Sequence, residues 1–246
     1  MQIITVAIIK GGTGKTVTAA SLAQAGAAAG KRVLAVDLDP QANLTISLGA
    51  DPNKAGAVQL FKGQPATDVM QDTEQNITVI GAHRDLANET TTPGSAKRLR
   101  TALKPIENNF DLCIIDTPPT LGELVYNALN ATQGLLIPLE TDANSLQGLY
   151  QIIDLAQQIG QTNPQLTILG VVLTRFDERP KINKYLRDVI AEKGKEAGAP
   201  LLKAIRSGVA VREAAAMQQS LFDYAPNSKP AADYMQLYKA ITKERG

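Results

Sequence analysis

Short apolar stretches alternate along the chain with longer segments rich in alanine, leucine and glutamine, which predicts strands and helices in turn. Several of the short stretches are apolar at nearly every position, as is typical of parallel strands covered on both faces. The expected strands are 3–9, 32–37, 77–81, 111–116, 134–139 and 166–174. The pattern therefore predicts an α/β fold with a single doubly wound, mostly parallel sheet and helices on both faces.

Two segments indicate how helices fit this plan. The stretch 19–29 has helix-forming composition and ends at Gly30, a common helix stop. The tail 233–241 carries an apolar stripe and is expected to dock on the sheet as a helix. We find no internal repeat and no linker rich in Pro, Ser or Gly. We therefore expect one domain over residues 1–246, without a separate helix-turn-helix domain before Lys10.

Composition excludes several classes of protein. The apolar runs 3–9 and 134–139 are far shorter than the roughly 18 residues of a membrane-spanning helix. The first residues lack the basic region and cleavage site of a signal peptide, so we expect a cytoplasmic protein. The chain has one cysteine, Cys113, and one histidine, His83, too few for an internal disulfide or a zinc centre. Cys113 lies inside an expected strand and is interpreted as core packing.

The most specific motif follows the first expected strand: Lys10-Gly11-Gly12-Thr13-Gly14-Lys15-Thr16. A strand, a glycine-rich turn and a helix start place backbone N–H groups around an anion, and the helix dipole adds positive charge. Lys15 is expected to reach the β- and γ-phosphates of a nucleotide, and Thr16 to bind Mg²⁺. The spacing is that of GxxxxGK[ST], except that Lys10 stands in place of the first glycine.

Carboxylates follow two further strands. Asp37 and Asp39 stand at the carboxyl end of the strand 32–37, where an open α/β sheet binds its ligand. Asp116 ends the strand at 111–116 in the manner of a residue that holds Mg²⁺. Each alone fits a helix cap or a surface turn equally well. Together with the phosphate loop they predict a nucleoside triphosphatase site.

The net charge of +1 conceals an asymmetry. Up to Thr174 there are 11 Lys and Arg against 15 Asp and Glu, and from Arg175 onward there are 14 against 9. By itself this imbalance is equally compatible with a solvated surface and with a binding face for an anionic partner.

The motifs KGGTGKT, DLDPQAN and IIDTPP, in this order and at these separations, closely resemble those of the ParA/Soj partition ATPases, a deviant phosphate-loop class that also includes MinD. The resemblance continues through the segments 173–179 and 211–214 to 224–228. It implies the cofactors ATP and Mg²⁺, with Gly11, Gly12, Thr13, Gly14, Val17, Pro226 and Asn227 beside the nucleotide.

The resemblance also implies roles for charged residues. Lys10 is expected to cross a two-fold interface to the partner's ATP, so that ATP clamps two subunits face to face. Lys15 completes the catalytic set, Asp39 is expected to orient the attacking water, and Thr16, Asp39 and Asp116 are expected to hold the metal. Hydrolysis would then release the dimer, so the enzyme would act as a timer.

The resemblance further implies that the ATP dimer binds DNA at the nucleoid. It also implies a ParB-like adaptor protein as a second partner. Arg179 matches a DNA-contacting arginine of the family, and Arg212 and Lys229 are further candidates. The wider basic set is Arg179, Lys181, Lys184, Arg187, Lys203, Arg206, Arg212 and Lys229. With 4% aromatic residues, the chain favours binding to the backbone of duplex DNA over base stacking.

The sequence departs from the family pattern at Val17, at Ala210 and at 206–208, where members carry Thr, a basic residue and Pro-Arg-Asn. Two related functions stay open: a positioner of protein cargo, and a MinD-like membrane-cycling ATPase, whose terminal membrane helix we do not expect here. An iron-protein relative would need two cysteines per subunit, so Cys113 alone argues against it.

Overall fold

The computed structural model describes residues 1–88, 95–142 and 145–242. Seven strands form one sheet in the order β3-β4-β2-β5-β1-β6-β7. The strands are β1 Gln2–Val6, β2 Val33–Asp37, β3 Met70–Asp72, β4 Ile77–Ile80, β5 Leu112–Asp116, β6 Gly134–Leu139 and β7 Thr167–Leu173. All neighbours run parallel except β3, which pairs antiparallel with β4. The predicted doubly wound, mostly parallel sheet is confirmed.

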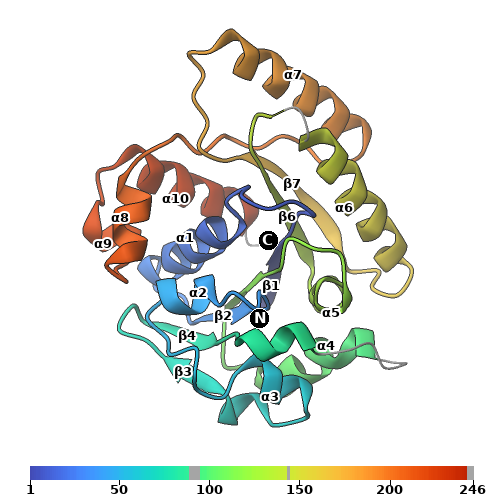
Figure 1. The fold of residues 1–246 in the computed structure, drawn as a ribbon, viewed down its shortest axis with the longest axis vertical. Helices are drawn as coiled ribbons and strands as arrows, with labels where there is room; N and C mark the ends of the chain where they lie inside the picture. The colour runs from blue at the N-terminus through green and yellow to red at the C-terminus, as the bar shows by residue number, and fades with distance from the viewer. Residues whose placement is uncertain (89–94, 143–144, 243–246) are drawn as a thin grey trace.

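Helices cover both faces of this sheet, as Figure 1 shows. Alternate residues of β1 separate the faces: Ile4 packs with one layer of helices and Ile3 with the other. The Ile4 layer contains α1 Lys15–Ala28, α2 Asn43–Ser47, α8 Ala210–Ala216, α9 Leu221–Tyr224 and α10 Lys229–Ile241. The other layer contains α3 Ala57–Phe61, α4 Arg98–Leu103, α5 Glu123–Ala131, α6 Ser145–Gly160 and α7 Lys181–Glu196.

The structure differs from the sequence prediction at the sheet's edge and at strand ends. The prediction missed β3, because its three residues are mostly polar and only partly buried. It also carried the first strand to Ile9, whereas β1 ends at Val6. Apolar content could not mark that end, since Ala7 and Ile8 stay buried after the chain leaves the sheet. The predicted strand 134–139 matches β6 in full.

The helix α1 lies close against the sheet because its inner face carries small residues. A Cβ on Gly26 would come within 2.9 Å of Cδ2 of Leu112 and 3.0 Å of Cγ2 of Val33, so either those side chains or the helix would have to shift. After Ala28 the chain turns at Gly30, which has φ +75 as a helix-ending glycine requires. The predicted stop at Gly30 is confirmed.

The predicted C-terminal docking helix is α10, which packs on α1 and on the sheet. Its buried residues include Tyr234, Leu237, Tyr238 and Ile241. Each fully buried side chain of this size stabilises the fold by about 1.5–3 kcal/mol. Ser228 caps the helix, since its Oγ accepts the N–H of Ala231 at 3.3 Å.

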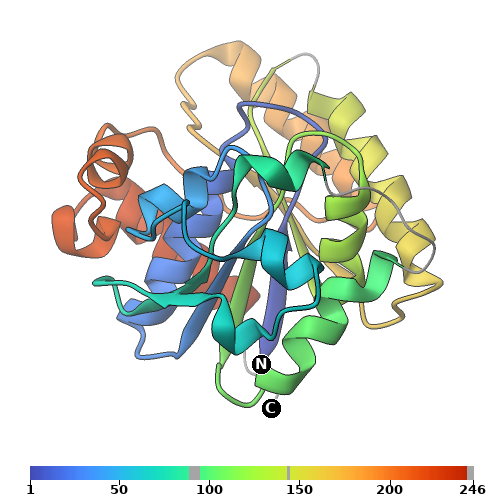
Figure 2. The ribbon, with the colours of Figure 1, turned by 60° about the horizontal axis from the view of Figure 1, so that its bottom comes forward.

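Because the strands are parallel, the chain segments that follow them gather at one edge of the sheet. In Figure 2 the loop after β1, in dark blue, lies at the upper end of its strand, opposite to the marked N. The ends of β2, β5, β6 and β7 reach the same edge. This edge is where an open α/β sheet binds ligands.

Candidate nucleotide site

The loop between β1 and α1 has the backbone geometry of an anion cradle. Gly12 and Gly14 both have φ +79, the left-handed region that favours glycine. Gly14 caps α1, whose first turn contains no acidic side chain. The first N–H groups of a helix have no partner within the helix, so those of α1 and its dipole face this loop.

Lys15 is held inside this cradle. The residue is 6% exposed, and its Nζ donates a hydrogen bond to the carbonyl of Lys10 at 2.7 Å. Burial lowers the pKa of Lys15, while the negative charges of Asp116 and Asp39 oppose that shift. A phosphate group would supply the negative charge that a buried ammonium needs.

Two polar atoms at the site have no hydrogen-bond partner among the described residues: Oγ1 of Thr13 and Oδ2 of Asp116, both buried. The other oxygen of Asp116 accepts the N–H of Thr117 at 3.0 Å. Burial raises the pKa of Asp116, and the charge of Asp37 adds to the effect, while Thr16 and Lys15 oppose it. Orphaned buried polar atoms require an external partner, so a phosphate and a hydrated Mg²⁺ fit these residues.

The two carboxylates at the carboxyl end of β2, Asp37 and Asp39, have different surroundings. Asp37 is fully buried and accepts hydrogen bonds from the N–H of Asp39 at 3.0 Å and from Thr45 N at 2.9 Å and Oγ1 at 2.7 Å. Burial raises the pKa of Asp37 to about 6. Asp39 is 8% exposed, and its Oδ1 accepts the N–H of Gln41 at 3.0 Å. Asp37 therefore fastens β2 to α2, and Asp39 is the carboxylate left to act on a ligand.

Cations flank the loop and are held by the chain that follows β6. The ammonium of Lys10 pairs with Asp142 and lies 3.5 Å from Oγ of Ser145. Arg175 pairs with Glu140 at 2.8 Å, and its Nη1 lies 3.5 Å from the carbonyl oxygen of Gly12. Sequence reasoning missed Glu140, Asp142 and Arg175, although all three stand just after strands that end at this edge.

Some predicted nucleotide residues are not brought to the loop by any contact among the described residues. Pro226 and Asn227 are exposed in the turn between α9 and α10. Val17 instead lines a hollow of about 390 Å³ between α1, α2 and α8. The roles of Val17, Pro226 and Asn227 stay predictions.

A basic hollow of about 830 Å³ lies beside the end of β7. Arg179 and Lys229 both line it, whereas Arg212 lies on α8 and does not. Arg179 forms a two-pronged ion pair with Asp177, with its Nη2 2.6 Å from Oδ2, and these hydrogen bonds lower the pKa of Asp177 to about 2. The other cations that line the hollow are Arg187, Lys203 and Arg206.

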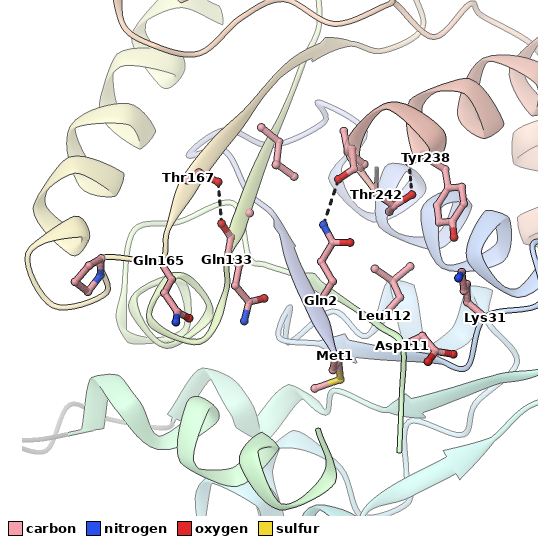
Figure 3. Close-up of a pocket in the computed structure, with 14 residues that line it drawn as sticks. Met1, Gln2, Lys31, Asp111, Leu112, Gln133, Gln165, Thr167, Tyr238 and Thr242 are labelled. Carbon is pink, nitrogen blue, oxygen red and sulfur yellow. Dashed lines mark hydrogen bonds between the residues drawn. The ribbon is translucent and has the colours of Figure 1, made fainter. Parts of the chain in front are cut away.

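A further hollow of about 780 Å³ lies at the opposite, amino-terminal edge of the strands (Figure 3). Two of the polar side chains that line it bind within the fold: Gln2 Nε2 donates to the carbonyl of Ile241 at 3.2 Å, and Thr167 Oγ1 donates to that of Gln133 at 3.0 Å. This hollow lies apart from the phosphate loop, which is at the carboxyl edge.

Among residues 1–88, 95–142 and 145–242, no group of three or more His, Cys, Asp or Glu side chains is arranged to hold a metal ion. No helix in those ranges has the length and apolar character needed to cross a membrane. Mg²⁺ commonly takes much of its coordination from phosphate and water.

The sheet order, the phosphate loop and the carboxylates after β2 and β5 define a phosphate-loop nucleoside triphosphatase. The AAA domain family matches residues 1–168. The chain is 33% identical to the sporulation initiation inhibitor protein Soj of Bacillus subtilis, over 98% of each chain. It is 32% identical to the chromosome partitioning protein ParA of Caulobacter vibrioides, over 100% of this chain and 96% of that one.

A solved structure of another protein has the same fold. The cobyrinic acid a,c-diamide synthase of Mycobacterium smegmatis, crystallised with an ATP analogue and magnesium, superposes with a TM-score of 0.85 and 30% identity, over 97% of this chain and 93% of that one. The chain belongs to the ParA/MinD-type partition ATPases, and it is an ATP hydrolase of that family.

Proposed function

We propose that this chain is an ATP-dependent dimerising switch that binds duplex DNA without sequence preference and acts with a ParB-like adaptor in the partition of a plasmid or chromosome. ATP and Mg²⁺ are its cofactors, and its place in the cell is the nucleoid in the cytoplasm. The observation that carries the proposal is the phosphate cradle with Lys10 at its outer rim and a basic hollow beside the same sheet edge.

ATP binding rests on the cradle. The N–H groups at the start of α1 and the ammonium of Lys15 hold the phosphates. The buried hydroxyl of Thr13, which has no hydrogen-bond partner among the described residues, is available to bind a phosphate oxygen as well. Thr16, with Asp116 and Asp39, would hold Mg²⁺, which neutralises charge on the phosphates. Asp39 orients the attacking water, because the carboxylate of its neighbour Asp37 already accepts two hydrogen bonds from Thr45.

Dimerisation rests on Lys10. Its side chain is 23% exposed and lies at the rim of the loop, where Gly11 and Gly12 are exposed as well. A lysine in this place can leave Asp142 and reach the phosphates of a second subunit that faces it. Charge that develops on the transferred phosphoryl group is then neutralised only when two subunits have met.

DNA binding rests on the basic hollow. Its five cations exceed the two acidic side chains that line it, Asp177 and Glu178. Phosphate contacts of this kind carry no sequence information. If each subunit makes about three phosphate contacts, the dimer makes about six, and the slope of log affinity against log salt is roughly −5.

The test measures retention on random duplex DNA at several salt concentrations with ATP, ADP or no nucleotide. We expect DNA binding with ATP but not with ADP or without nucleotide. Arg179→Ala should weaken DNA binding and flatten the salt slope by roughly two units per dimer. Asp177→Asn should strengthen binding, because it removes the carboxylate charge that competes with DNA for Arg179.

A matched control is Arg32→Ala. Arg32 is an exposed arginine with an equivalent two-pronged pair to Asp111, but it lies at the opposite edge of the sheet. DNA binding should be unchanged in this variant. Equal binding with ADP, or equal loss in Arg32→Ala and Arg179→Ala, would contradict the proposal. Retention on anionic liposomes instead of DNA would point to membrane cycling.

A further inference from the structure

The end of β7 engages two consecutive carbonyl groups of the phosphate loop. Oγ1 of Thr174 lies 2.8 Å from the carbonyl oxygen of Thr13, and Nη1 of Arg175 lies 3.5 Å from that of Gly12. Thr174 is 4% exposed, and its hydroxyl is also 3.2 Å from the carbonyl of Leu139. Both residues lie in the segment 173–179, in which only Arg179 has a role predicted from the sequence.

The backbone at this point is turned to make both contacts. Thr174 N donates to the carbonyl of Leu139 at 2.8 Å, and Phe176 N donates to that of Ile205 at 2.8 Å. Between them Arg175 has φ +50, which residues other than glycine seldom adopt. Such a conformation persists only where its surroundings hold it, and it often marks a functional position. Here the pair with Glu140 holds the guanidinium beside the loop.

Fixing a carbonyl also fixes the N–H of the following residue, because the peptide group is planar and trans. The two contacts therefore set the direction of the N–H groups of Thr13 and Gly14, which belong to the cradle. The approach is close: a Cβ on Gly14 would lie 3.2 Å from Oγ1 of Thr174. We propose that Thr174 and Arg175 are positioning residues that hold the phosphate loop in its nucleotide-binding conformation.

This inference rests on the proposed role of the loop as the phosphate site. Its central test is Thr174→Val, which keeps the shape of the side chain and removes the hydroxyl. The dissociation constants of ATP and ADP with Mg²⁺ are measured by isothermal titration. We expect both to rise about tenfold, the effect of one buried hydrogen bond. Thr174→Ser should recover affinity to within about threefold of the wild type.

The matched control is Thr132→Val. Thr132 is 1% exposed, and its hydroxyl donates to the carbonyl of Ile3 at 2.6 Å, away from the phosphate loop. This variant should lose thermal stability to a similar extent as Thr174→Val and keep its nucleotide affinity. Arg175→Met, which leaves the Thr174 hydroxyl in place, should raise both dissociation constants by about threefold, because its contact with the loop is longer.

The outcomes separate this inference from the proposed function. Wild-type affinity in Lys15→Ala would overturn the phosphate site itself. Loss of binding in Lys15→Ala with wild-type affinity in Thr174→Val would overturn only the positioning role. Equal weakening in Thr132→Val and Thr174→Val would reduce the effect to general stability and also overturn it. If Thr174→Val fails to fold, Arg175→Met decides, and wild-type affinity there refutes the inference.

Discussion

Removal of the carboxylate that holds Lys10 should make the ATP dimer form more readily. In the structure Lys10 pairs with Asp142 of its own chain, so the lysine must leave this partner before it can reach across an interface. Asp142→Asn keeps the shape of the side chain and removes its charge. The variant therefore lowers the cost of moving Lys10 without altering the cradle.

The size of the effect follows from exposure. The side chains of Lys10 and Asp142 are 23% and 42% exposed, so solvent screens the pair and its contribution is about 0.5–1 kcal/mol. A symmetric dimer breaks two such pairs, which gives about 1–2 kcal/mol. The dissociation constant of the ATP dimer should then fall by about 5- to 30-fold.

The assay is sedimentation equilibrium or light scattering over a protein dilution series with ATP and Mg²⁺, in an Asp39→Ala background that hydrolyses slowly. The control repeats the measurement with Lys10→Ala, in which Asp142→Asn should change nothing, since no lysine is released. An unchanged or weaker dimer in Asp142→Asn would refute the view that this pair restrains Lys10.

The remaining predictions concern the phosphate loop and the ion pair between Asp233 and Arg206. Lys15→Ala should abolish ATP binding in isothermal titration, because the phosphates lose a charge-assisted contact. Asp39→Ala should bind ATP and dimerise but hydrolyse it about 100-fold more slowly or worse in a phosphate-release assay, whereas Lys10→Ala should bind ATP as a monomer. Burial alone would raise the pKa of Asp233, but the hydrogen bonds from Arg206 outweigh it and leave the pKa lowered. Asp233→Asn should therefore cost about 2 kcal/mol, or about 4–8 °C of melting temperature at pH 7. That difference should shrink as the pH falls below about 4, since the wild type loses the same stabilisation when its carboxylate is protonated.

The sequence predicted the parts of the site whose chemistry is local. The loop from Lys10 to Thr16 is contiguous, and the spacing of its glycines and lysine is itself the phosphate-binding motif. Asp39 and Asp116 became candidates because Asp116 ends the apolar strand β5 and Asp39 stands two residues after the apolar strand β2. In a parallel sheet those strands must end at one edge, so order along the chain was sufficient to bring the residues together.

The contacts of Lys10 and Thr174 could not be predicted in the same way. Asp142 stands 132 positions from Lys10, and Thr174 stands 161 positions from Thr13. Nothing in a single sequence states that β6 pairs with β1 and β7 with β6 at this register. The positive φ of Arg175 could not be predicted either, because arginine has no preference for the left-handed region.

The bond between Gln2 and the carbonyl of Ile241 closes β1 against α10 at the edge remote from the phosphate loop. A surface anchor or a fluorophore attached near either of these residues would leave the nucleotide face turned outward. Immobilised in that orientation, one subunit could capture a second from solution, and exchange between subunits could be followed in real time on a sensor chip.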